Sequence, residues 1–376
     1  MSSPKLPLQS FRLKNFKAVR DSGIIRFTPL TVLIGNNGSG KSSLIEGLEM
    51  FQQIVLQGID EAIQPWRGFE HVWNKAVEHK LKKNRKISNP MSFEIKGSFR
   101  RGLVTDIIPV RVDLSLEMDR EKNTVSISAY KVKLPEEEYP QGLMGDSLPE
   151  QTVRNHLHLH TMTSSWKFLT ILPQHMQYPV LQKRTKGGVA LSKDGANVAE
   201  YFESIRKADV SIFRDIIETL QSVLPYADDL QPAITSELER TVYLTLKEKG
   251  IEDKLPGWLL SQGTLRILAL LCVLRHPAPP SVIVIEEIEN GLDPRTVHML
   301  VDEIRAFVQS GKGQVIASTH SPYLLDLLTL SQIIVVERDE KGSPVFHRPS
   351  EDKELSIWAE KFAPGKLYTM GNMTRR

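Results

Sequence analysis

Hydrophobic and polar positions near the start of the chain predict short strands followed by a helix. The segments SFRLKNF, GIIRF and LTVLI are rich in apolar and β-branched residues, and the last one ends at Ile34. A glycine-rich stretch follows it. From Lys41 onward, apolar residues recur at helical spacing, at Leu44, Leu48, Phe51 and Val55. The pattern therefore predicts a strand, a turn and a helix over residues 30–55.

Between residues 91 and 134 the pattern changes to alternation of apolar and polar side chains. Three groups of residues each share one face of an expected strand: Phe93, Ile95 and Phe99; Val110, Val112, Leu114 and Leu116; Tyr130, Val132 and Leu134. Alternation of this kind is typical of an antiparallel sheet with one face in water. We therefore predict an antiparallel β lobe in this part of the chain.

The last third of the chain alternates helical and extended patterns. We expect helices at 262–274, 295–310 and 322–329, and strands at 281–286, 313–318 and 332–337. Such a series is typical of βαβ units with parallel pairing. Before it, NVAEYFESIR and VSIFRDIIETL predict helices, and TVYLTL predicts a strand.

The segment NHLHLH predicts a further short strand. Its alternation would place His156, His158 and His160 on one face. Three histidines on one face could bind a metal, but no carboxylate or cysteine lies nearby in the sequence. We therefore interpret the segment as a polar strand face.

Composition narrows the class of protein without identifying a function. The chain has 376 residues, 40% of them hydrophobic and 25% charged, which are ordinary values for a globular protein. A net charge of +3 does not by itself indicate nucleic-acid binding. Cys272 is the one cysteine, so an internal disulfide and a cysteine-based metal cluster are excluded. We expect no signal peptide and no membrane span, and hence a protein of the cytoplasm.

The segment GNNGSGKS matches the phosphate-binding loop pattern G-x-x-x-x-G-K-[ST], with a predicted strand before it and a helix after it. Lys41 is expected to reach the β- and γ-phosphates, and the Ser42 hydroxyl to bind Mg²⁺. The predicted nucleotide-binding residues are Gly35, Asn36, Asn37, Gly38, Ser39, Gly40, Lys41, Ser42 and Ser43. The guanine-reading pattern Asn-Lys-x-Asp is absent, which favours ATP.

The segment VIVIEE predicts a buried strand that ends in a pair of carboxylates. A P-loop requires a carboxylate near Mg²⁺, and we assign this role to Glu286. Glu287 is then the candidate general base for the attacking water. Mg²⁺ and Lys41 would offset the repulsion between the two like charges.

Two further segments are candidates for contacts with phosphate. LSQGT opens the helix expected at 262–274, where Ser261 can cap the helix and Gly263 allows close approach to an anion. In STHSP, His320 follows a predicted strand and can contact a γ-phosphate through a ring nitrogen.

In this order, GNNGSGKS, LSQGT, VIVIEE, ENGLDP and STHSP resemble the head of the ABC-type ATPases, in particular the SMC- and RecF-like branch and its stand-alone prokaryotic AAA-family relatives. The resemblance implies an ABC/SMC-type head: an α/β P-loop NTPase with a mixed parallel sheet, an antiparallel β lobe and an inserted helical section. We expect an N-terminal ATPase lobe at 1–134, the insertion at 135–240, a C-terminal lobe at 241–340 and a tail at 341–376.

The resemblance also implies roles for particular residues. Two heads would dimerise around ATP, and the signature residues Ser261, Gln262 and Gly263 would contact the nucleotide of the other subunit. Asp293, in NGLD, would lie near the dimer interface as the D-loop residue. The segment Lys14–Phe16 matches an N-terminal segment that often contacts nucleotide. Gln174 is our candidate for the Q-loop glutamine, with an exposed loop glutamine as the alternative.

Two departures from the family pattern concern hydrolysis more than binding. The signature has Gln262 and Thr264 where glycine and glutamine are common, and the metal carboxylate is a glutamate where aspartate is usual. The distance in sequence between Ser42 and Ser261 is longer than in the ATPase subunits of membrane transporters of this family. A stand-alone head is therefore favoured over a transporter motor.

A basic run follows the first helix. It contains Lys80, Lys82, Lys83, Arg85 and Lys86. We interpret it as a solvated loop, with a nucleic-acid contact as the alternative.

The main hypothesis is an ATP-dependent dimerising switch that slow hydrolysis by Glu287 resets. It would act on a protein effector such as a nuclease or toxin in prokaryotic antiphage defence. The alternatives are a RecF-like DNA-repair ATPase that binds DNA directly and an ATP-gated scaffold without hydrolysis.

Overall fold

The computed structural model describes residues 6–74, 89–100, 107–119, 122, 124–135, 157–183, 188–236 and 239–373. These residues form two compact units. The first comprises residues 1–166 and 329–376, and the second comprises residues 167–328. The division expected from the sequence, at residues 1–134, 135–240, 241–340 and 341–376, stays a prediction.

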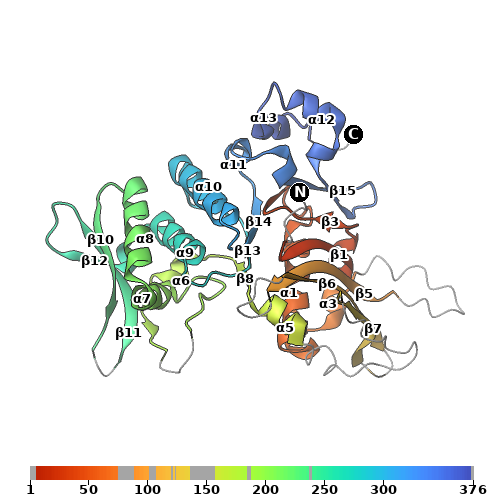
Figure 1. The fold of residues 1–376 in the computed structure, drawn as a ribbon, viewed down its shortest axis with the longest axis horizontal. Coiled ribbons are helices and arrows are strands. Elements are labelled where there is room, and N and C mark those ends of the chain that lie inside the picture. The colour runs from red at the N-terminus through yellow and green to blue at the C-terminus, as the bar shows by residue number, and fades with distance from the viewer. Residues whose placement is uncertain are drawn as a thin grey trace, which may run out of the picture. The chain divides into compact units, whose positions relative to one another are not determined.

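An antiparallel sheet dominates the first unit (Figure 1). Its path is β2–β1–β5–β6–β7, and β3 pairs with β1. The strands are β1 (Leu8–Phe16), β2 (Val19–Asp21), β3 (Ile25–Arg26), β5 (Met91–Arg100), β6 (Ile107–Asp119) and β7 (Thr124–Lys133). The predicted antiparallel lobe is confirmed.

One face of this sheet is buried under helix α1 (Lys41–Leu56). Phe93 and Val112, on neighbouring strands, are 0% exposed. The ring of Phe51 lies 6.1 Å from that of Phe93. A Cβ atom on Gly47 would lie 2.4 Å from Leu13 Cδ2, so the glycine allows the helix to approach β1 closely. The alternation in the sequence thus produces a core between sheet and helix.

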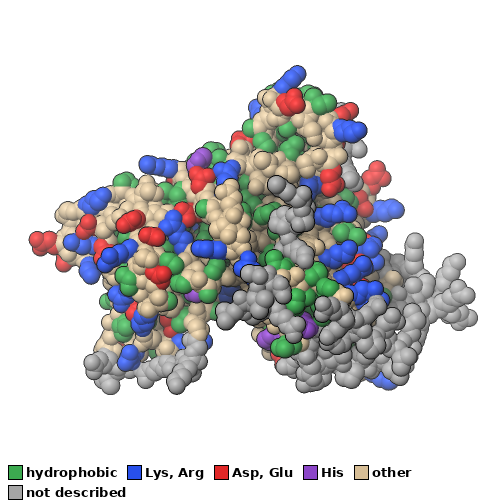
Figure 2. Space-filling model, in the orientation of Figure 1, with side chains coloured by type: hydrophobic (Ala, Val, Ile, Leu, Met, Phe, Trp, Pro, Cys, Tyr) green, Lys and Arg blue, Asp and Glu red, His purple; other side chains and the backbone are tan. Residues whose placement is uncertain are grey.

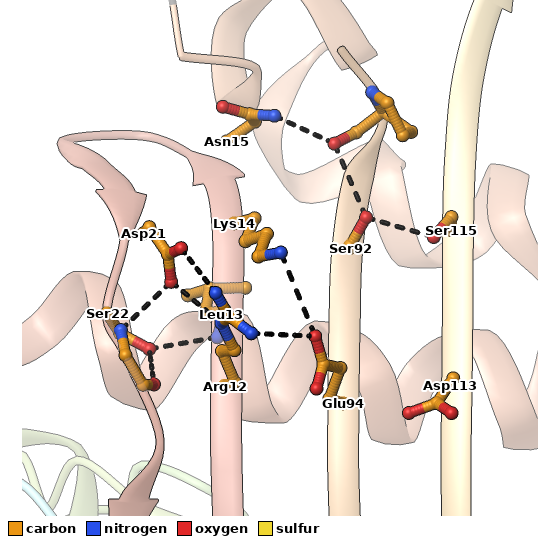
Figure 3. Close-up of polar contacts among 12 residues, drawn as sticks. Arg12, Leu13, Lys14, Asn15, Asp21, Ser22, Ser92, Glu94, Asp113 and Ser115 are labelled. Atoms are coloured by element: carbon orange, nitrogen blue, oxygen red, sulfur yellow. Dashed lines mark hydrogen bonds and ion pairs between the residues drawn. The ribbon is translucent and has the colours of Figure 1, made fainter. Parts of the chain in front are cut away.

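The opposite face of the sheet is polar (Figure 3). Arg12 Nη2 lies 2.7 Å from Asp21 Oδ2, and Glu94 Oε1 lies 3.4 Å from Arg12 Nη1 and 3.9 Å from Lys14 Nζ. The hydrogen bond from Arg12 lowers the pKa of Asp21. Because these groups are partly in water, such ion pairs contribute little to stability.

The first unit also holds a parallel strand pair beside the glycine-rich loop. Strand β4 (Leu30–Ile34) pairs in parallel with β15 (Ile333–Arg338), and β15 pairs antiparallel with β16 (Pro344–His347). The remaining helices of this unit are α2 (Ile59–Ile63), η1 (Gln64–Trp66), α3 (Phe69–Val72), α5 (Leu157–Ser164), η4 (Leu330–Gln332), η5 (Pro349–Glu351), α12 (Lys353–Trp358) and α13 (Pro364–Thr369).

The strand predicted at NHLHLH is wrong. Residues from Leu157 onward form α5, and His156 lies outside the described residues. Leu159 and Met162 are buried, and α5 packs on α1. Residues two apart on a helix do not share a face, so His158 and His160 point in different directions. Packing against α1 therefore overrides the local alternation.

The second unit carries a parallel strand pair and a separate antiparallel sheet. Strand β13 (Val282–Ile285) pairs in parallel with β14 (Gln314–Thr319), and β8 (Trp166–Leu169) lies on the other side of β13. The antiparallel sheet contains β9 (Val180–Leu181), β10 (Ala227–Ile234), β11 (Thr241–Glu248) and β12 (Lys254–Pro256). In Figure 1, α7 and α8 cover one face of that sheet.

The helices of the second unit are α6 (Pro173–Met176), α7 (Val198–Ala208), α8 (Val210–Val223), η3 (Gly257–Leu259), α9 (Gln262–Leu274), α10 (Pro294–Gln309) and α11 (Pro322–Asp326). The helix predicted at 262–274 is confirmed, and the other predicted elements of this region agree within a few residues at each end. Cys272 is buried in α9, and burial raises the pKa of its thiol. Among the described residues, no helix has the length and apolar character needed to cross a membrane.

Candidate functional site

The glycine-rich loop lies in the first unit, between β4 and α1. Gly38 and Gly40 have φ angles of 72° and 119°, which L side chains rarely adopt. A Cβ atom on Gly35 would lie 2.1 Å from the carbonyl oxygen of Val336. The glycines are therefore required by the backbone itself, and they allow the loop to curl at the start of the helix.

Lys41 lies under this loop and is only 6% exposed. Its Nζ donates to the carbonyl oxygens of Gly35 at 2.7 Å and Asn36 at 3.2 Å. Among the described residues, the buried hydroxyl of Ser39 has no hydrogen-bond partner. A bound phosphate would offer acceptor oxygens to both groups, so the loop has the chemistry of an anion site.

Several other residues of the loop are exposed to solvent. Asn36, Asn37, Gly38 and Ser42 are exposed, and Ser43 is half-buried. The first turn of α1 carries no acidic side chain, so nothing there opposes the positive end of the helix dipole. The nucleotide-binding roles of these residues stay predictions.

Glu286 follows the fully buried strand β13 in the second unit. Its N–H donates to the carbonyl oxygen of Leu169 at 3.0 Å, at the end of β8. The hydroxyl of Thr170 donates to Glu286 Oε1 at 3.2 Å. The carboxylate is thus half-buried and held by a neighbouring hydroxyl. Mg²⁺ prefers oxygen ligands and keeps several waters, so this carboxylate fits the metal role predicted for Glu286.

Glu287 adopts a left-handed backbone conformation, with φ of 47°. Its N–H donates to the hydroxyl of Ser318 at 3.0 Å, and its Oε2 lies 3.4 Å from Asn290 Nδ2. A non-glycine residue in this region costs on the order of 1 kcal/mol. The Glu287 side chain is exposed, and its role as general base stays a prediction.

Arg266 connects this pair of glutamates to α9, and the sequence reasoning missed it. Its guanidinium donates to the carbonyl oxygens of Ile171 at 2.9 Å, Glu286 at 3.2 Å and Glu287. The residue is 2% exposed, and burial lowers its pKa. A single arginine within the apolar run LRILALLCVL was the available signal, because a buried charge requires partners.

The signature residues occupy the first turn of α9. Ser261 is exposed and caps the helix, with its Oγ accepting from Thr264 N–H at 3.0 Å. Gln262 is also exposed. A Cβ atom on Gly263 would lie 2.8 Å from the carbonyl oxygen of Gly291. The glycine therefore allows the start of α9 to approach the segment before α10. Its predicted contact with an anion is a separate role.

His320 and Asp293 lie at the ends of neighbouring elements. His320 is exposed directly after β14, and its N–H donates to Glu289 Oε1 at 2.7 Å. Asp293 caps α10, accepting from Arg295 N–H at 2.9 Å and from the Thr296 hydroxyl at 2.6 Å. The hydrogen bond from Thr296 lowers the pKa of Asp293. A direct role of His320 in catalysis and a dimer contact through Asp293 stay predictions.

Gln174, the candidate Q-loop residue, is exposed on α6. The side chain that reaches Glu286 from this region is Thr170, four residues earlier. The basic run from Lys80 to Lys86 lies outside the described residues.

The second unit thus brings the signature helix, both glutamates and His320 into one hydrogen-bonded region, joined through Arg266, Ser318 and Glu289. The P-loop lies in the first unit.

Comparison with protein families gives two matches. The model described as "AAA ATPase domain" matches residues 7–221, and that described as "AAA domain, putative AbiEii toxin, Type IV TA system" matches residues 186–326. A curated relative from Helicobacter pylori (strain ATCC 700392 / 26695), named "ATP/GTP phosphatase", is 22% identical over 336 residues. That match covers 85% of this chain and 87% of the relative.

Solved structures with the same fold include heads of SMC proteins. An SMC head bound to the C-terminal winged-helix domain of ScpA has a TM-score of 0.59 and 15% identity, covering 93% of this chain and 99% of that one. An SMC head with an extended coiled coil, bound to the C-terminal domain of ScpA derived from Pyrococcus furiosus, has a TM-score of 0.58 and 13% identity, with coverages of 94% and 98%. The predicted fold class is confirmed: the chain has the ABC/SMC-type P-loop head fold.

Proposed function

The chain belongs to the AAA ATPase domain family and is an ATPase, and from this premise we propose that it is a switch that dimerises around ATP. The P-loop of one subunit would bind ATP and Mg²⁺, and the signature segment of the other subunit, Ser261 to Gly263, would close the site. Hydrolysis of ATP would then allow the two subunits to separate.

The observation that carries this proposal is the contact of Arg266 with the backbone of both glutamates. Arg266 lies on α9, whose first turn is the signature segment. ATP bound to the partner subunit would contact Ser261 at the start of α9. A shift of α9 on this contact would move Arg266 and, through its hydrogen bonds, the backbone of Glu286 and Glu287. Such a link makes hydrolysis depend on dimerisation, as a switch requires.

Each side chain has a proposed part in the reaction. Lys41 would bind the β- and γ-phosphates, and Glu286 and Ser42 would hold Mg²⁺. Glu287 would orient and deprotonate the attacking water, and His320 would contact the γ-phosphate. The metal, when bound, neutralises phosphate charge. The left-handed turn at Glu287 supports its role, since it keeps the carboxylate open to water.

The Glu287→Gln change tests the switch. It keeps the shape of the side chain but removes the base, so we expect ATP turnover to fall at least a hundredfold while ATP binding persists and a dimer accumulates. Turnover and size-exclusion chromatography with ATP are the measurements. Glu218→Gln, on the exposed face of α8, is the matched control. Unchanged turnover in the Glu287→Gln variant would show that Glu287 is not the general base.

Dimerisation has its own test at the signature. A Ser261→Arg change places a bulky cation where the partner's ATP would lie. We expect it to prevent dimer formation while leaving ATP binding by the monomer intact. A dimer that still forms with ATP would contradict the proposed geometry. If the wild-type chain forms the ATP-dependent dimer but does not hydrolyse ATP, the ATP-gated scaffold is favoured.

We further propose that the switch acts on a protein effector, a nuclease or toxin, in prokaryotic antiphage defence. The match of residues 186–326 to the model described as "AAA domain, putative AbiEii toxin, Type IV TA system" supports a role in a toxin–antitoxin or defence system. Co-purification with the product of the neighbouring gene, with ATP and with ADP, tests it. Capture that does not depend on the nucleotide would argue against a switch.

Direct binding of nucleic acid is the second candidate, favoured by a row of basic residues on the polar face of the antiparallel sheet. The register places Arg26 opposite Ser10, Ser10 opposite Lys96, Lys96 opposite Arg111 and Arg111 opposite Lys133. Figure 2 shows Lys and Arg side chains gathered over this part of the molecule. Arg111 lies 4.0 Å from Glu94 Oε2 and 3.5 Å from Asp113 Oδ1, which offset part of the repulsion between the like charges. A phosphate backbone along the row would offset it further.

The Lys96→Glu, Arg111→Glu double change tests this candidate, with the exposed Lys249→Glu as control. We expect a fall in affinity for single- and double-stranded DNA and a weaker salt dependence. An affinity equal to that of the wild type would leave the nucleic-acid candidate without support from this row.

A further inference from the structure

The strand hairpin formed by β15 and β16 lies directly against the P-loop. Within the first unit, β15 pairs in parallel with β4, and Val335 is opposite Ile34. The next residues along both strands are Val336 and Gly35, and a Cβ atom on Gly35 would collide with the Val336 carbonyl oxygen. The loop therefore begins in van der Waals contact with a strand that lies about 300 residues later in the chain.

Arg338, the last residue of β15, connects the P-loop to the turn of the hairpin. Its Nε donates to the carbonyl oxygen of Gly38 at 2.8 Å, and its Nη1 donates to the carbonyl oxygen of Gly342 at 2.7 Å. One planar guanidinium thus holds two backbone segments at a fixed separation.

The turn that carries Gly342 is itself well ordered by hydrogen bonds. Asp339 N–H donates to Ser343 O at 2.9 Å, and Asp339 Oδ1 accepts from Ser343 N–H at 2.7 Å. Gly342 has φ of 75°, which the turn requires. Arg338 is therefore held by the turn through Gly342, and its Nε holds the P-loop through Gly38.

The hairpin also contacts the end of the P-loop. Pro344 lies opposite Arg338 in the hairpin and is buried. A Cβ atom on Gly40 would lie 2.6 Å from Pro344 Cγ. The loop is therefore in contact with the hairpin at its first glycine, its middle glycine and its last glycine.

Two side chains hold carbonyl groups of the loop. Lys41 donates to those of Gly35 and Asn36, and Arg338 donates to that of Gly38, at the middle of the loop. A P-loop binds phosphate through its N–H groups, so a carbonyl oxygen turned toward the phosphate would repel it. A side chain that holds a loop carbonyl therefore favours the conformation that binds phosphate.

We propose that Arg338 is a positioning residue for nucleotide binding. It holds the Gly38 carbonyl by a hydrogen bond and so keeps the loop in the conformation that accepts the phosphates of ATP. It acts through the backbone and does not touch the nucleotide. This role rests on the ATP binding assigned to the P-loop.

Three variants of Arg338 test the role. Arg338→Ala removes both hydrogen bonds, Arg338→Gln keeps a neutral donor, and Arg338→Lys keeps the charge but reaches one carbonyl at a time. The control is Arg305→Ala in the second unit, where an arginine also donates to a backbone carbonyl, that of Leu327, and to Asp302.

For Arg338→Ala we expect the Kd for a fluorescent ATP analogue and the KM for ATP to rise about fivefold, because the arginine that donates the lost hydrogen bond is exposed to solvent. The kcat is expected to stay within about twofold, because no reacting group is lost. Arg338→Lys is expected to recover part of the affinity. The Tm without nucleotide should match that of Arg305→Ala, whose Kd stays at the wild-type value.

Wild-type Kd and KM in Arg338→Ala and Arg338→Gln would overturn the proposal, as would a fall in kcat with an unchanged KM. If Arg338→Ala fails to fold, the Kd of the folded Gln and Lys variants decides in the same way. These outcomes leave the ATPase switch intact. A wild-type chain that does not bind ATP would overturn both.

Discussion

The hydroxyl of Thr170 donates a hydrogen bond to Glu286 Oε1 at 3.2 Å, across 116 residues of sequence. The Thr170 N–H in turn donates to the carbonyl oxygen of Lys193 at 2.9 Å, which fixes the threonine on the segment after β8. The contact selects one orientation of the carboxylate before a metal arrives. In this chain a threonine therefore supports the carboxylate that we assign to Mg²⁺.

Replacing Thr170 with valine keeps the shape of the side chain and removes this donor. We expect the Mg²⁺ concentration for half-maximal turnover to rise about fivefold, because one hydrogen bond of about 1 kcal/mol no longer orients Glu286. Thr170→Ser should stay near the wild type. Thr219→Val, which loses a hydroxyl bonded to a helix carbonyl on α8, is the control. An unchanged Mg²⁺ requirement in Thr170→Val would exclude this role.

Arg266→Met tests the connection between α9 and the two glutamates. The change removes a donor from three carbonyl oxygens, of which that of Glu287 still accepts from Asn290 N–H at 3.0 Å. We therefore expect the free energy of unfolding to fall by about 2 kcal/mol. Turnover at temperatures where the variant is folded should fall further than ATP binding. Urea denaturation and steady-state kinetics measure the two effects. Arg275→Met breaks a partly exposed two-bond pair with Glu303 and a bond to the Asp215 carbonyl oxygen, and it should cost less stability than Arg266→Met.

The left-handed conformation of Glu287 predicts a difference between two variants that both lack the carboxylate. Glycine tolerates a φ of 47° and alanine does not, so Glu287→Gly should be more stable than Glu287→Ala by about 1 kcal/mol. Both variants should lose turnover. Equal stabilities in urea would show that the backbone relaxes out of the left-handed region when the side chain is shortened.

Asp293 is expected to make the free energy of unfolding depend on pH. Its pKa is lowered in the folded protein, chiefly by the Thr296 hydroxyl, so the unfolded chain takes up a proton first as the pH falls. The stabilisation is present above the unfolded pKa and is lost as the pH drops through the folded pKa. Asp293→Asn keeps a capping acceptor but does not titrate, so its stability difference from the wild type should shrink below about pH 4.

That difference is measured by urea denaturation between neutral and acid pH. A difference that stays constant over this range would mean that the aspartate caps α10 through its shape alone. Asp352→Asn, at the cap of α12, provides a comparison at a second helix start.

Several parts of the fold could be read from local pattern because neighbouring residues create them. The helix at 262–274 follows from apolar spacing and a serine cap, and the alternating strands of the antiparallel lobe from their period of two. The loop from Gly35 to Ser42 is a contiguous motif, so its position between strand and helix was also predictable. Where packing opposed the local pattern, as at α5, the prediction was wrong.

The sequence by itself thus determined most of the element order, the P-loop and the acidic pair after β13, since each depends on residues close together in the chain. Only the tertiary structure decided which side chains support them. Arg338 reaches Gly38 across 300 residues, and Thr170 reaches Glu286 across 116. The physical reason is that a hydrogen bond depends on distance in space, and the packing of strands and helices sets that distance. No period along the chain encodes it.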